Sequence, residues 1–224
     1  MTTFAIGDIH GQVAALKTVF NEWAFGPDDT LVFLGDYVDR GPDVRGVIEF
    51  LITHPLKDQF VFLKGNHELM MIAARQGGLP LKQWVMNGGA ETLDAYGIGD
   101  DPKWYQQIPA SHWAFLESGL PYYESGSTVF VHAGLEPGVP PEQQDLHHLY
   151  WKKYLTPEAY DRNKTVVCGH TSRKNGLIAD FGHTICIDTY AYGGQWLTCL
   201  DVDHLNYLQT RENGEVRKGK LSPG

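Results

Sequence analysis

Three short apolar runs in the first third of the chain are each followed by a polar turn and then by apolar residues at helical spacing. The runs are Phe4 to Ile6, Thr30 to Leu34 and Phe60 to Leu63. The helices that follow are predicted from Val13 to Trp23, from about Asp43 to Ile52, and through Leu69, Ile72 and Ala73. Three strand–helix units in series predict right-handed crossovers and a parallel sheet with helices on its faces.

The middle of the chain changes first to helices and then to strands. Helical spacing from Leu81 to Tyr96 is interrupted at Asn87-Gly88-Gly89, where a helix should break, and another helix is predicted from Trp104 to Leu116. From Pro121 onward the pattern favours strands, which we expect to form a second, mixed sheet. These strands are Tyr122-Tyr123, Thr128 to Val131, Thr165 to Cys168, Thr184 to Ile187, Trp196 to Leu200 and Leu205 to Gln209. We expect the charged, glycine-bearing tail, residues 211–224, to form a turn, at most one short strand and a loosely ordered end.

Composition limits the class of protein. The 224 residues, of which 42% are apolar, can bury a substantial core, and we expect a single α/β domain over residues 1–224. A net charge of -9 without a clustered basic face argues against nucleic acid as a stable partner. Cys168, Cys186 and Cys199 lie far apart in apolar segments, which is typical of buried thiols in a reducing compartment. Because neither a signal peptide nor a membrane-spanning run is evident, we expect a cytoplasmic protein without membrane contact.

Polar turns follow the first three predicted strands and two of the later ones. In open α/β sheets the ligand crevice lies beyond the carboxyl ends of the strands, so these turns should converge. They contain oxygen and imidazole donors without a thiolate, namely Asp8, His10, Asp36, Asn66, His132 and His170. Such donors suit manganese, iron or zinc better than calcium. Six donors suit two ions about 3.5–4 Å apart that share a carboxylate, and we expect Asp36 to be that bridge.

Each of these residues also has a simpler interpretation. Asp, Asn and Gly are common in turns because they cap helices and accept left-handed backbone geometry, and a lone histidine is often a core residue. Asp39 and Arg40 could form only a local salt bridge. Four aromatic residues are interpreted as core rather than as part of a site. They are Trp84, Tyr190, Tyr192 and Trp196.

The polar turns also match a known set of motifs in order and spacing. They read Gly7-Asp8-Ile9-His10-Gly11, then Gly35-Asp36-Tyr37-Val38-Asp39-Arg40-Gly41, then Gly65-Asn66-His67-Glu68, followed by His132-Ala133-Gly134 and Gly169-His170-Thr171. This pattern resembles the PPP-type serine/threonine protein phosphatases of the calcineurin-like metallophosphoesterase superfamily. The compact length is similar to the bacterial and phage (lambda phosphatase-like) branch. The resemblance implies a four-layer fold with a central β-sandwich of two mixed sheets flanked by helices.

The resemblance also implies a role for each motif residue. Asp8, His10 and Asp36 would hold one divalent ion, and Asp36, Asn66, His132 and His170 the second, with Mn2+ favoured and Fe or Zn as alternatives. His67 would be the general acid and Asp39 the carboxylate that orients it, while Arg40 and Asn66 would bind the substrate phosphate. A hydroxide that bridges the metals would attack phosphorus directly, without a phosphoenzyme. Whether Lys64, Lys152 or Lys153 contacts phosphate stays open, since lysine lacks the fork of arginine.

We therefore expect a dinuclear-metal-dependent hydrolase that removes phosphate from phosphoserine and phosphothreonine, with phosphotyrosine as a further substrate. Its partners would be phosphoproteins or phosphopeptides, and the protein would be a monomer. Because the motifs determine the reaction but not the leaving group, a diadenosine tetraphosphate hydrolase or an RNA 5′-end pyrophosphatase is the main alternative. A non-catalytic metal-binding scaffold is the second alternative, although the presence of His67, Asp39 and Arg40 argues against it.

Overall fold

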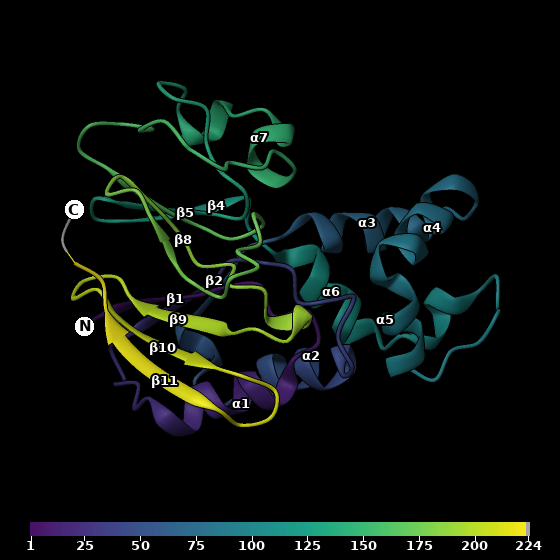
Figure 1. Ribbon diagram of the computed structural model, residues 1–224. Coiled ribbons are helices and arrows are strands. Elements are labelled where there is room, and N and C mark those ends of the chain that lie inside the picture. Colours follow the sequence, from purple (N-terminus) through teal and green to yellow (C-terminus); the bar gives the residue numbers. More distant parts are fainter. Residues whose placement is uncertain (223–224) are drawn as a thin grey trace.

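Two mixed β-sheets face each other at the centre of the molecule, as Figure 1 shows for the computed structural model, which describes residues 1–222. The six-stranded sheet has the order β11-β10-β9-β1-β2-β3, and its strands are Val216–Lys220, Asn206–Thr210, Leu197–Asp201, Thr3–Ile6, Thr30–Phe33 and Phe60–Phe62. The five-stranded sheet has the order β4-β5-β6-β8-β7, and its strands are Tyr122–Ser125, Thr128–Val131, Thr165–Cys168, Thr184–Cys186 and Ala179–Asp180.

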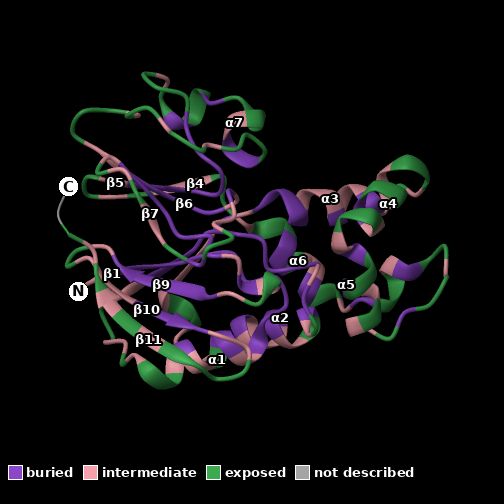
Figure 2. Ribbon diagram, viewed as in Figure 1, coloured by how far each residue is buried: buried purple, intermediate pink, exposed green. Residues whose placement is uncertain are grey.

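The alternation of side chains along each strand divides the apolar residues into three layers. In β1, Ala5 faces the other sheet, whereas Phe4 and Ile6 face the helices outside. In β5, Phe130 lies between the sheets and its neighbours point to the opposite face. This is the two-residue period of a strand that is buried on both sides. The central strands are accordingly buried along most of their length (Figure 2).

Helices cover both outer faces and one end of the sandwich (Figure 1). α1 (Val13–Glu22) and α2 (Val44–Thr53) pack on the six-stranded sheet, and α7 (Leu146–Tyr150) packs outside the other sheet. A cap at the end of the sandwich is formed by α3 (Asn66–Ala74), α4 (Gly78–Trp84), a π turn (Val85–Gly89), α5 (Ala90–Ala95) and α6 (Ala110–Ser118). Short 3-10 turns occur at Lys57–Gln59, Trp104–Gln107, Pro141–Gln143 and Ala191–Gly193. None of the helices in residues 1–222 is both long and apolar enough to cross a membrane.

The predicted strand–helix units are confirmed, but the later strands do not all join the second sheet. β1, β2 and β3 are parallel neighbours, as the three units predict. β9 instead pairs with β1, antiparallel, and β10 pairs with β9, so the prediction that both belong to a separate sheet is wrong. Apolar alternation predicts a strand without specifying its partner, because any strand with two buried faces can enter either sheet.

The helical breaks in the cap have clear causes. The predicted interruption at Asn87-Gly88-Gly89 is confirmed, since Gly88 has a φ of 112° inside the π turn. The predicted helix from Trp104 to Leu116 is wrong as one element, because Pro109 separates a 3-10 turn from α6. Proline lacks an amide hydrogen and keeps the residue before it extended, and Ile108 has a ψ of 132°.

The tail contains one short strand, β11, but it is less loosely ordered than expected, because it completes the six-stranded sheet up to Lys220. β11 pairs with β10 from Val216 to Lys220. The guanidinium groups of Arg211 and Arg217 lie over the Trp196 ring, 4.1 Å and 4.3 Å from its centroid. Low apolar content hid this order, because edge hydrogen bonds and cation–π contacts hold the segment in place of a buried apolar face. The last two positions of the expected tail, 223–224, lie outside the described residues.

Replacing Arg217 tests whether this hairpin contributes to stability. Arg217→Ala removes the contact with Trp196 and the hydrogen bond to Gln209 Oε1, so we expect the free energy of unfolding to fall by about 1–3 kcal/mol. Urea denaturation measures this change, with Arg162→Ala as the control on an exposed arginine. Equal stability of the two variants would contradict an ordered C-terminal hairpin.

Candidate active site

The polar turns at the strand ends lie together, and their backbones are unusual. Positive φ angles occur at His10 (45°), Asp36 (53°), Asp39 (71°), Arg40 (67°) and His170 (60°). Non-glycine residues avoid this region, and such strain is concentrated at functional sites. The five residues belong to three turns, which follow β1, β2 and β6. The structure therefore brings these predicted turns together and holds their backbones in strained conformations.

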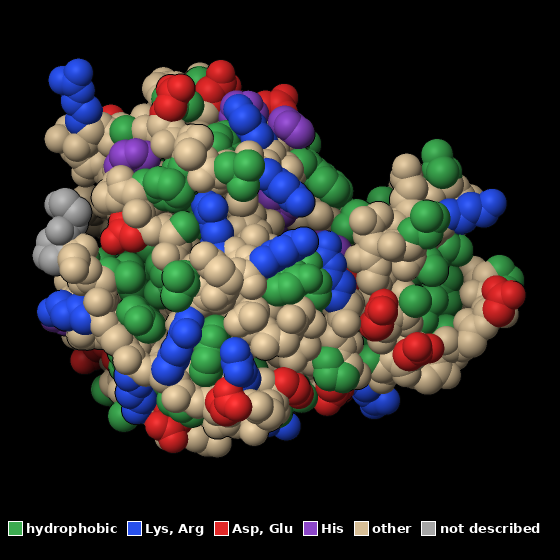
Figure 3. All heavy atoms as spheres, viewed as in Figure 1, with side chains coloured by type: hydrophobic (Ala, Val, Ile, Leu, Met, Phe, Trp, Pro, Cys, Tyr) green, Lys and Arg blue, Asp and Glu red, His purple; other side chains and the backbone are tan. Residues whose placement is uncertain are grey.

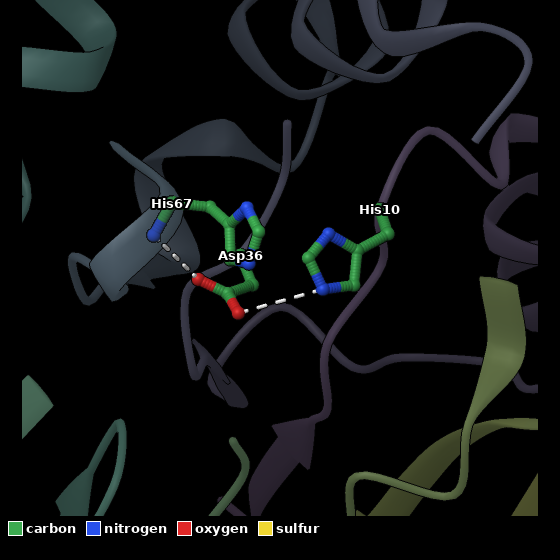
Figure 4. Close-up of side chains that lie close together, drawn as sticks. All are labelled: His10, Asp36 and His67. Atoms are coloured by element: carbon green, nitrogen blue, oxygen red, sulfur yellow. Dashed lines mark hydrogen bonds and ion pairs between the residues drawn. The ribbon is translucent and has the colours of Figure 1, made fainter. Parts of the chain in front are cut away.

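The buried carboxylate of Asp36 lies at the centre of this cluster (Figure 4). Its Oδ2 is 3.4 Å from His10 Nε2, and its Oδ1 accepts a hydrogen bond from the His67 amide at 3.1 Å. His132 Nε2 lies 3.4 Å from the same Oδ1. Burial opposes ionisation, yet the four surrounding histidines hold the pKa of Asp36 well below its usual range. The carboxylate is thus a charged acceptor between two groups of imidazoles.

The backbone determines which nitrogen of each ligand histidine is free. His132 Nδ1 is 2.8 Å from the Leu34 carbonyl, and His170 Nε2 is 2.9 Å from the Trp151 carbonyl. Carbonyls only accept hydrogen bonds, so these nitrogens carry the protons. The other nitrogens, which are bare in a neutral ring, both lie 3.0 Å from Asn66 Oδ1.

Lone pairs therefore face lone pairs in this part of the site. Burial, with His132 close by, lowers the pKa of His170 to about 4, so its ring is neutral at pH 7. The bare His170 nitrogen is directed at the Asn66 oxygen, so the lone pairs of these two atoms repel each other unless a cation lies between them. The donor set thus fits a divalent ion bound by nitrogen and oxygen.

Asp36 is shared by two possible ligand groups. His10, Asp36 and His67 offer ligand atoms that all lie within 4.8 Å of one another, and Asp36, His132 and His170 do the same. His10 Nδ1 is 2.7 Å from the Val38 carbonyl, which leaves Nε2, the acceptor for Arg40 Nη1 at 3.0 Å, as the unprotonated nitrogen on the side of Asp36. Burial and the nearby His67 lower the pKa of His10 and keep its ring neutral. This geometry suits two ions on either side of one carboxylate.

Asp8 joins the first and the last of these turns. Its Oδ2 accepts a hydrogen bond from the His170 amide at 3.0 Å, although β1 and β6 belong to different sheets. Burial, then Asp188, then Asp36 raise the pKa of Asp8. Asp188 is itself buried and accepts a hydrogen bond from Ser172 Oγ at 2.6 Å. Asp188 was not among the predicted site residues. It lies outside the sequence motifs, and only the fold brings it close to Asp8.

Glu68 holds the turn that carries Asp36. Its carboxylate accepts hydrogen bonds from the amides of Gly65 at 2.8 Å, Asp36 at 2.9 Å and Tyr37 at 2.8 Å. Burial and the neighbouring Asp36 raise the pKa of Glu68 to about 7. Glu68 was part of the Gly-Asn-His-Glu motif but had no predicted role. The ring of Tyr37, also without a predicted role, is buried, and its hydroxyl donates to the Leu63 carbonyl at 2.7 Å.

A second pair of residues lies beside the Asp36 cluster. His67 Nδ1 is 2.7 Å from Asp39 Oδ2, and both side chains are buried. Burial alone would lower the pKa of His67, but Asp36 and Asp39 reverse that effect and raise it. The His67 ring also meets the His10 ring edge to face, with centroids 4.7 Å apart. A histidine with a raised pKa, paired with a buried carboxylate, thus lies next to the candidate metal ligands.

Arg40, like His170, is only partly buried. Its side chain is half-buried, Nη1 lies 3.0 Å from His10 Nε2, and the guanidinium lies over the Tyr192 ring at 4.5 Å. Such a guanidinium can grip a phosphate with two parallel hydrogen bonds. Tyr192 was interpreted as a core residue, so the sequence analysis missed its contact with Arg40. No local signal could have found it, since Tyr192 approaches from a distant loop.

The lysines left open by the sequence lie at the margin of the site. Lys64 Nζ donates a hydrogen bond to the Glu117 carbonyl at 3.0 Å. Lys152 Nζ lies 5.0 Å from the centroid of the Tyr154 ring. Lys153 is near enough to His170 to lower the pKa of that ring.

Comparisons with known proteins agree with this arrangement. The Calcineurin-like phosphoesterase family model matches residues 1–205. A symmetrical bis(5'-nucleosyl)-tetraphosphatase from Legionella pneumophila is 33% identical over 61% of this chain and 46% of its own length. Serine/threonine-protein phosphatase 1 from Salmonella typhimurium is 28% identical over 86% of this chain and 88% of its own length. The chain thus spans about half the length of the tetraphosphatases it matches.

Solved structures share the fold at low sequence identity. A cold-active protein-tyrosine phosphatase from a psychrophilic Shewanella superposes with a TM-score of 0.66 at 17% identity, covering 97% of this chain and 80% of that one. A protein serine/threonine phosphatase from Saccharomyces cerevisiae gives a TM-score of 0.56 at 15% identity, covering 100% and 81%. The four-layer fold is therefore confirmed, and the chain belongs to the calcineurin-like phosphoesterase family, whose named relatives are hydrolases.

Proposed function

We propose that the protein is a two-metal hydrolase that cleaves the phosphoric anhydride of dinucleoside polyphosphates such as diadenosine tetraphosphate. The observation that carries metal-dependent hydrolysis is the opposition of the bare His170 nitrogen to the Asn66 oxygen, with His132 and Asp36 around the same point and the buried His67–Asp39 pair beside it. The name of the Legionella pneumophila relative supports the substrate class. The comparisons support this alternative better than the phosphoprotein substrate that the sequence analysis placed first.

Two divalent ions would share Asp36 in this proposal. Asp8, His10 and Asp36 would hold one ion, and Asp36, Asn66, His132 and His170 the other. The mixed nitrogen and oxygen donors favour manganese, with iron or zinc as alternatives. When bound, such ions make a hydroxide available at neutral pH by lowering the pKa of a water molecule from 15.7 to about 7.

The protein groups supply the grip on phosphate and the proton. Arg40, held over the Tyr192 ring, would bind phosphoryl oxygens together with the Asn66 amide. His67 would donate a proton to the leaving oxygen, and the Asp39 contact at Nδ1 leaves Nε2 to carry that proton. Asp39 would stabilise the imidazolium before the transfer. No covalent bond to the enzyme is needed in this scheme.

An apolar groove next to the site could hold a nucleobase. The groove has a volume of about 530 Å³ and is lined by Leu69, Met70, Ala73, Pro80, Gln83, Asn87 and Trp151. Trp151 is 40% exposed, and its carbonyl contacts His170. Figure 3 shows a hollow between the lobe with α7 and the lobe with α3 and α4. An exposed indole and two side-chain amides suit the face and edge of a base.

A phosphoprotein remains the second candidate substrate. The Salmonella typhimurium serine/threonine-protein phosphatase aligns with 86% of this chain, a larger share than the tetraphosphatase does. The same groove could hold an apolar side chain next to a phosphorylated residue. The scaffold alternative has no support from the site, because the His67–Asp39 pair and Arg40 are in place.

Substitution of His67 separates the acid role from metal binding. His67→Asn should keep two manganese ions per chain, because in this proposal His67 is not a ligand, while kcat falls by about 10²- to 10⁴-fold. Metal content by plasma mass spectrometry and steady-state kinetics measure the two effects. Loss of one ion in His67→Asn would show instead that His67 is a ligand, as its distance from Asp36 and His10 would permit.

A panel of substrates tests the proposed specificity. The manganese-loaded protein is given diadenosine tetraphosphate, a phosphoserine peptide, a phosphotyrosine peptide and triphosphorylated RNA, and we expect the highest kcat/KM for the dinucleotide. Trp151→Ala should raise KM for the dinucleotide about 5- to 100-fold, the range expected for one stacked base. Leu155→Ala, at an exposed apolar residue on the same loop, is the control. A higher kcat/KM for either peptide would favour the phosphoprotein function.

A further inference from the structure

The Asp39 carboxylate is surrounded by donors from the cap. Thr92 Oγ1 donates to Asp39 Oδ1 at 2.7 Å, and Trp84 Nε1 lies 2.9 Å from Oδ1 and 3.1 Å from Oδ2. The Asp39 amide in turn donates to Thr92 Oγ1 at 3.0 Å. Asp39, Trp84 and Thr92 are each fully buried, so water cannot replace these bonds.

These contacts divide the two oxygens of Asp39 between different tasks. Oδ1 accepts the shorter bonds from Thr92 and Trp84, whereas Oδ2 is the oxygen that faces His67 Nδ1 at 2.7 Å. If the carboxylate rotated so that Oδ2 left His67, the bonds of Oδ1 to Thr92 and Trp84 would break as well. Its orientation toward His67 is thereby determined by Thr92 and Trp84, whose hydrogen bonds described above go to Asp39 and not to His67.

The π turn brings the two donors to the same carboxylate. Trp84 ends α4 and Thr92 lies in α5, with Gly88 and Gly89 between them. A Cβ at Gly88 would lie 2.6 Å from Arg40 Cγ, and one at Gly89 would lie 2.5 Å from the Trp84 indole. The Gly88 carbonyl also accepts a hydrogen bond from the Arg40 amide at 3.0 Å. The turn therefore fits closely around the Asp39-Arg40 backbone.

We propose that Trp84 and Thr92 are positioning residues for the general acid, acting through Asp39 on His67. This inference rests on the proposed role of His67 as the proton donor. Asp39 has a φ of 71°, a strained conformation that the surrounding bonds must maintain. With a donor removed, the carboxylate can turn away from Nδ1, and the imidazolium loses the partner that directs its other proton toward the leaving oxygen.

The leaving-group dependence of hydrolysis tests the proposal. Proton donation matters most for a poor leaving group such as the phenolate of phenyl phosphate and least for the nitrophenolate of p-nitrophenyl phosphate. For Thr92→Val and Trp84→Phe we expect kcat to fall about 10- to 100-fold on phenyl phosphate, with a much smaller loss on p-nitrophenyl phosphate and little change in KM. Trp84→Phe keeps a ring against Trp104, which stacks on the indole with centroids 4.7 Å apart.

Three variants serve as references in the same experiment. Thr92→Ser keeps the hydroxyl and should restore kcat on phenyl phosphate. Trp113→Phe removes another indole hydrogen bond of the cap, to the Tyr105 carbonyl at 2.9 Å, and should behave as the wild type. His67→Asn, which lacks the proposed general acid, shows how much more kcat falls on phenyl phosphate than on p-nitrophenyl phosphate when no acid is present. Circular dichroism and thermal melts verify that each variant is folded.

The outcomes distinguish this inference from the function on which it rests. If His67→Asn shows strong leaving-group dependence and the Thr92 and Trp84 variants lose the same factor on both substrates, their role is structural and the positioning proposal fails. If His67→Asn itself loses the same factor on both substrates, the acid role of His67 fails and the positioning proposal with it. If kcat of both Thr92→Val and Trp84→Phe falls mainly on phenyl phosphate, the positioning proposal is supported.

Discussion

Lone pairs that face one another at a buried point of the fold are the constraint on which the rest of the site depends. Asn66 Oδ1 faces Nε2 of His132 and the bare Nδ1 of His170, and the buried Asp36 carboxylate lies in the same cluster. Without positive charge this arrangement is repulsive, and burial strengthens the repulsion because water cannot screen it. The strained turns, the Glu68 carboxylate and the hydrogen bond that His132 Nδ1 donates to the Leu34 carbonyl at the end of β2 all hold these groups against that repulsion.

The cap links the grip on substrate to the geometry of the proton donor. Asn87 lines the apolar groove, Gly88 bonds to the Arg40 amide, and Trp84 bonds to Asp39, all within one helical segment. A ligand in the groove would therefore press on the same segment that orients the acid. In the proposed function the cap would therefore influence proton transfer as well as cover the site. Its π turn makes possible both the contact with Arg40 and the contact with Asp39.

The sequence predicted the parts of the molecule that follow from local pattern. The parallel β1, β2 and β3, the break at Gly88 and the convergence of Asp36 with four motif histidines all follow from periodicity and strand-end turns. Contacts made by tertiary approach were missed. Trp84 reads as core from its apolar neighbours, and its burial is confirmed, yet the one polar atom of its ring decides its contact with Asp39. The firm pairing of β11 with β10 was missed because an edge strand needs few apolar residues.

The central claim is that Asp36 lies between two cations. Crystals grown with manganese, with diffraction data collected at the manganese absorption edge, would test it most directly. We expect two anomalous peaks about 3.5–4 Å apart, with an Asp36 oxygen between them. One peak should lie on the side of Asp8 and His10, and the other on the side of Asn66, His132 and His170. A single peak, or two peaks without Asp36 between them, would contradict it.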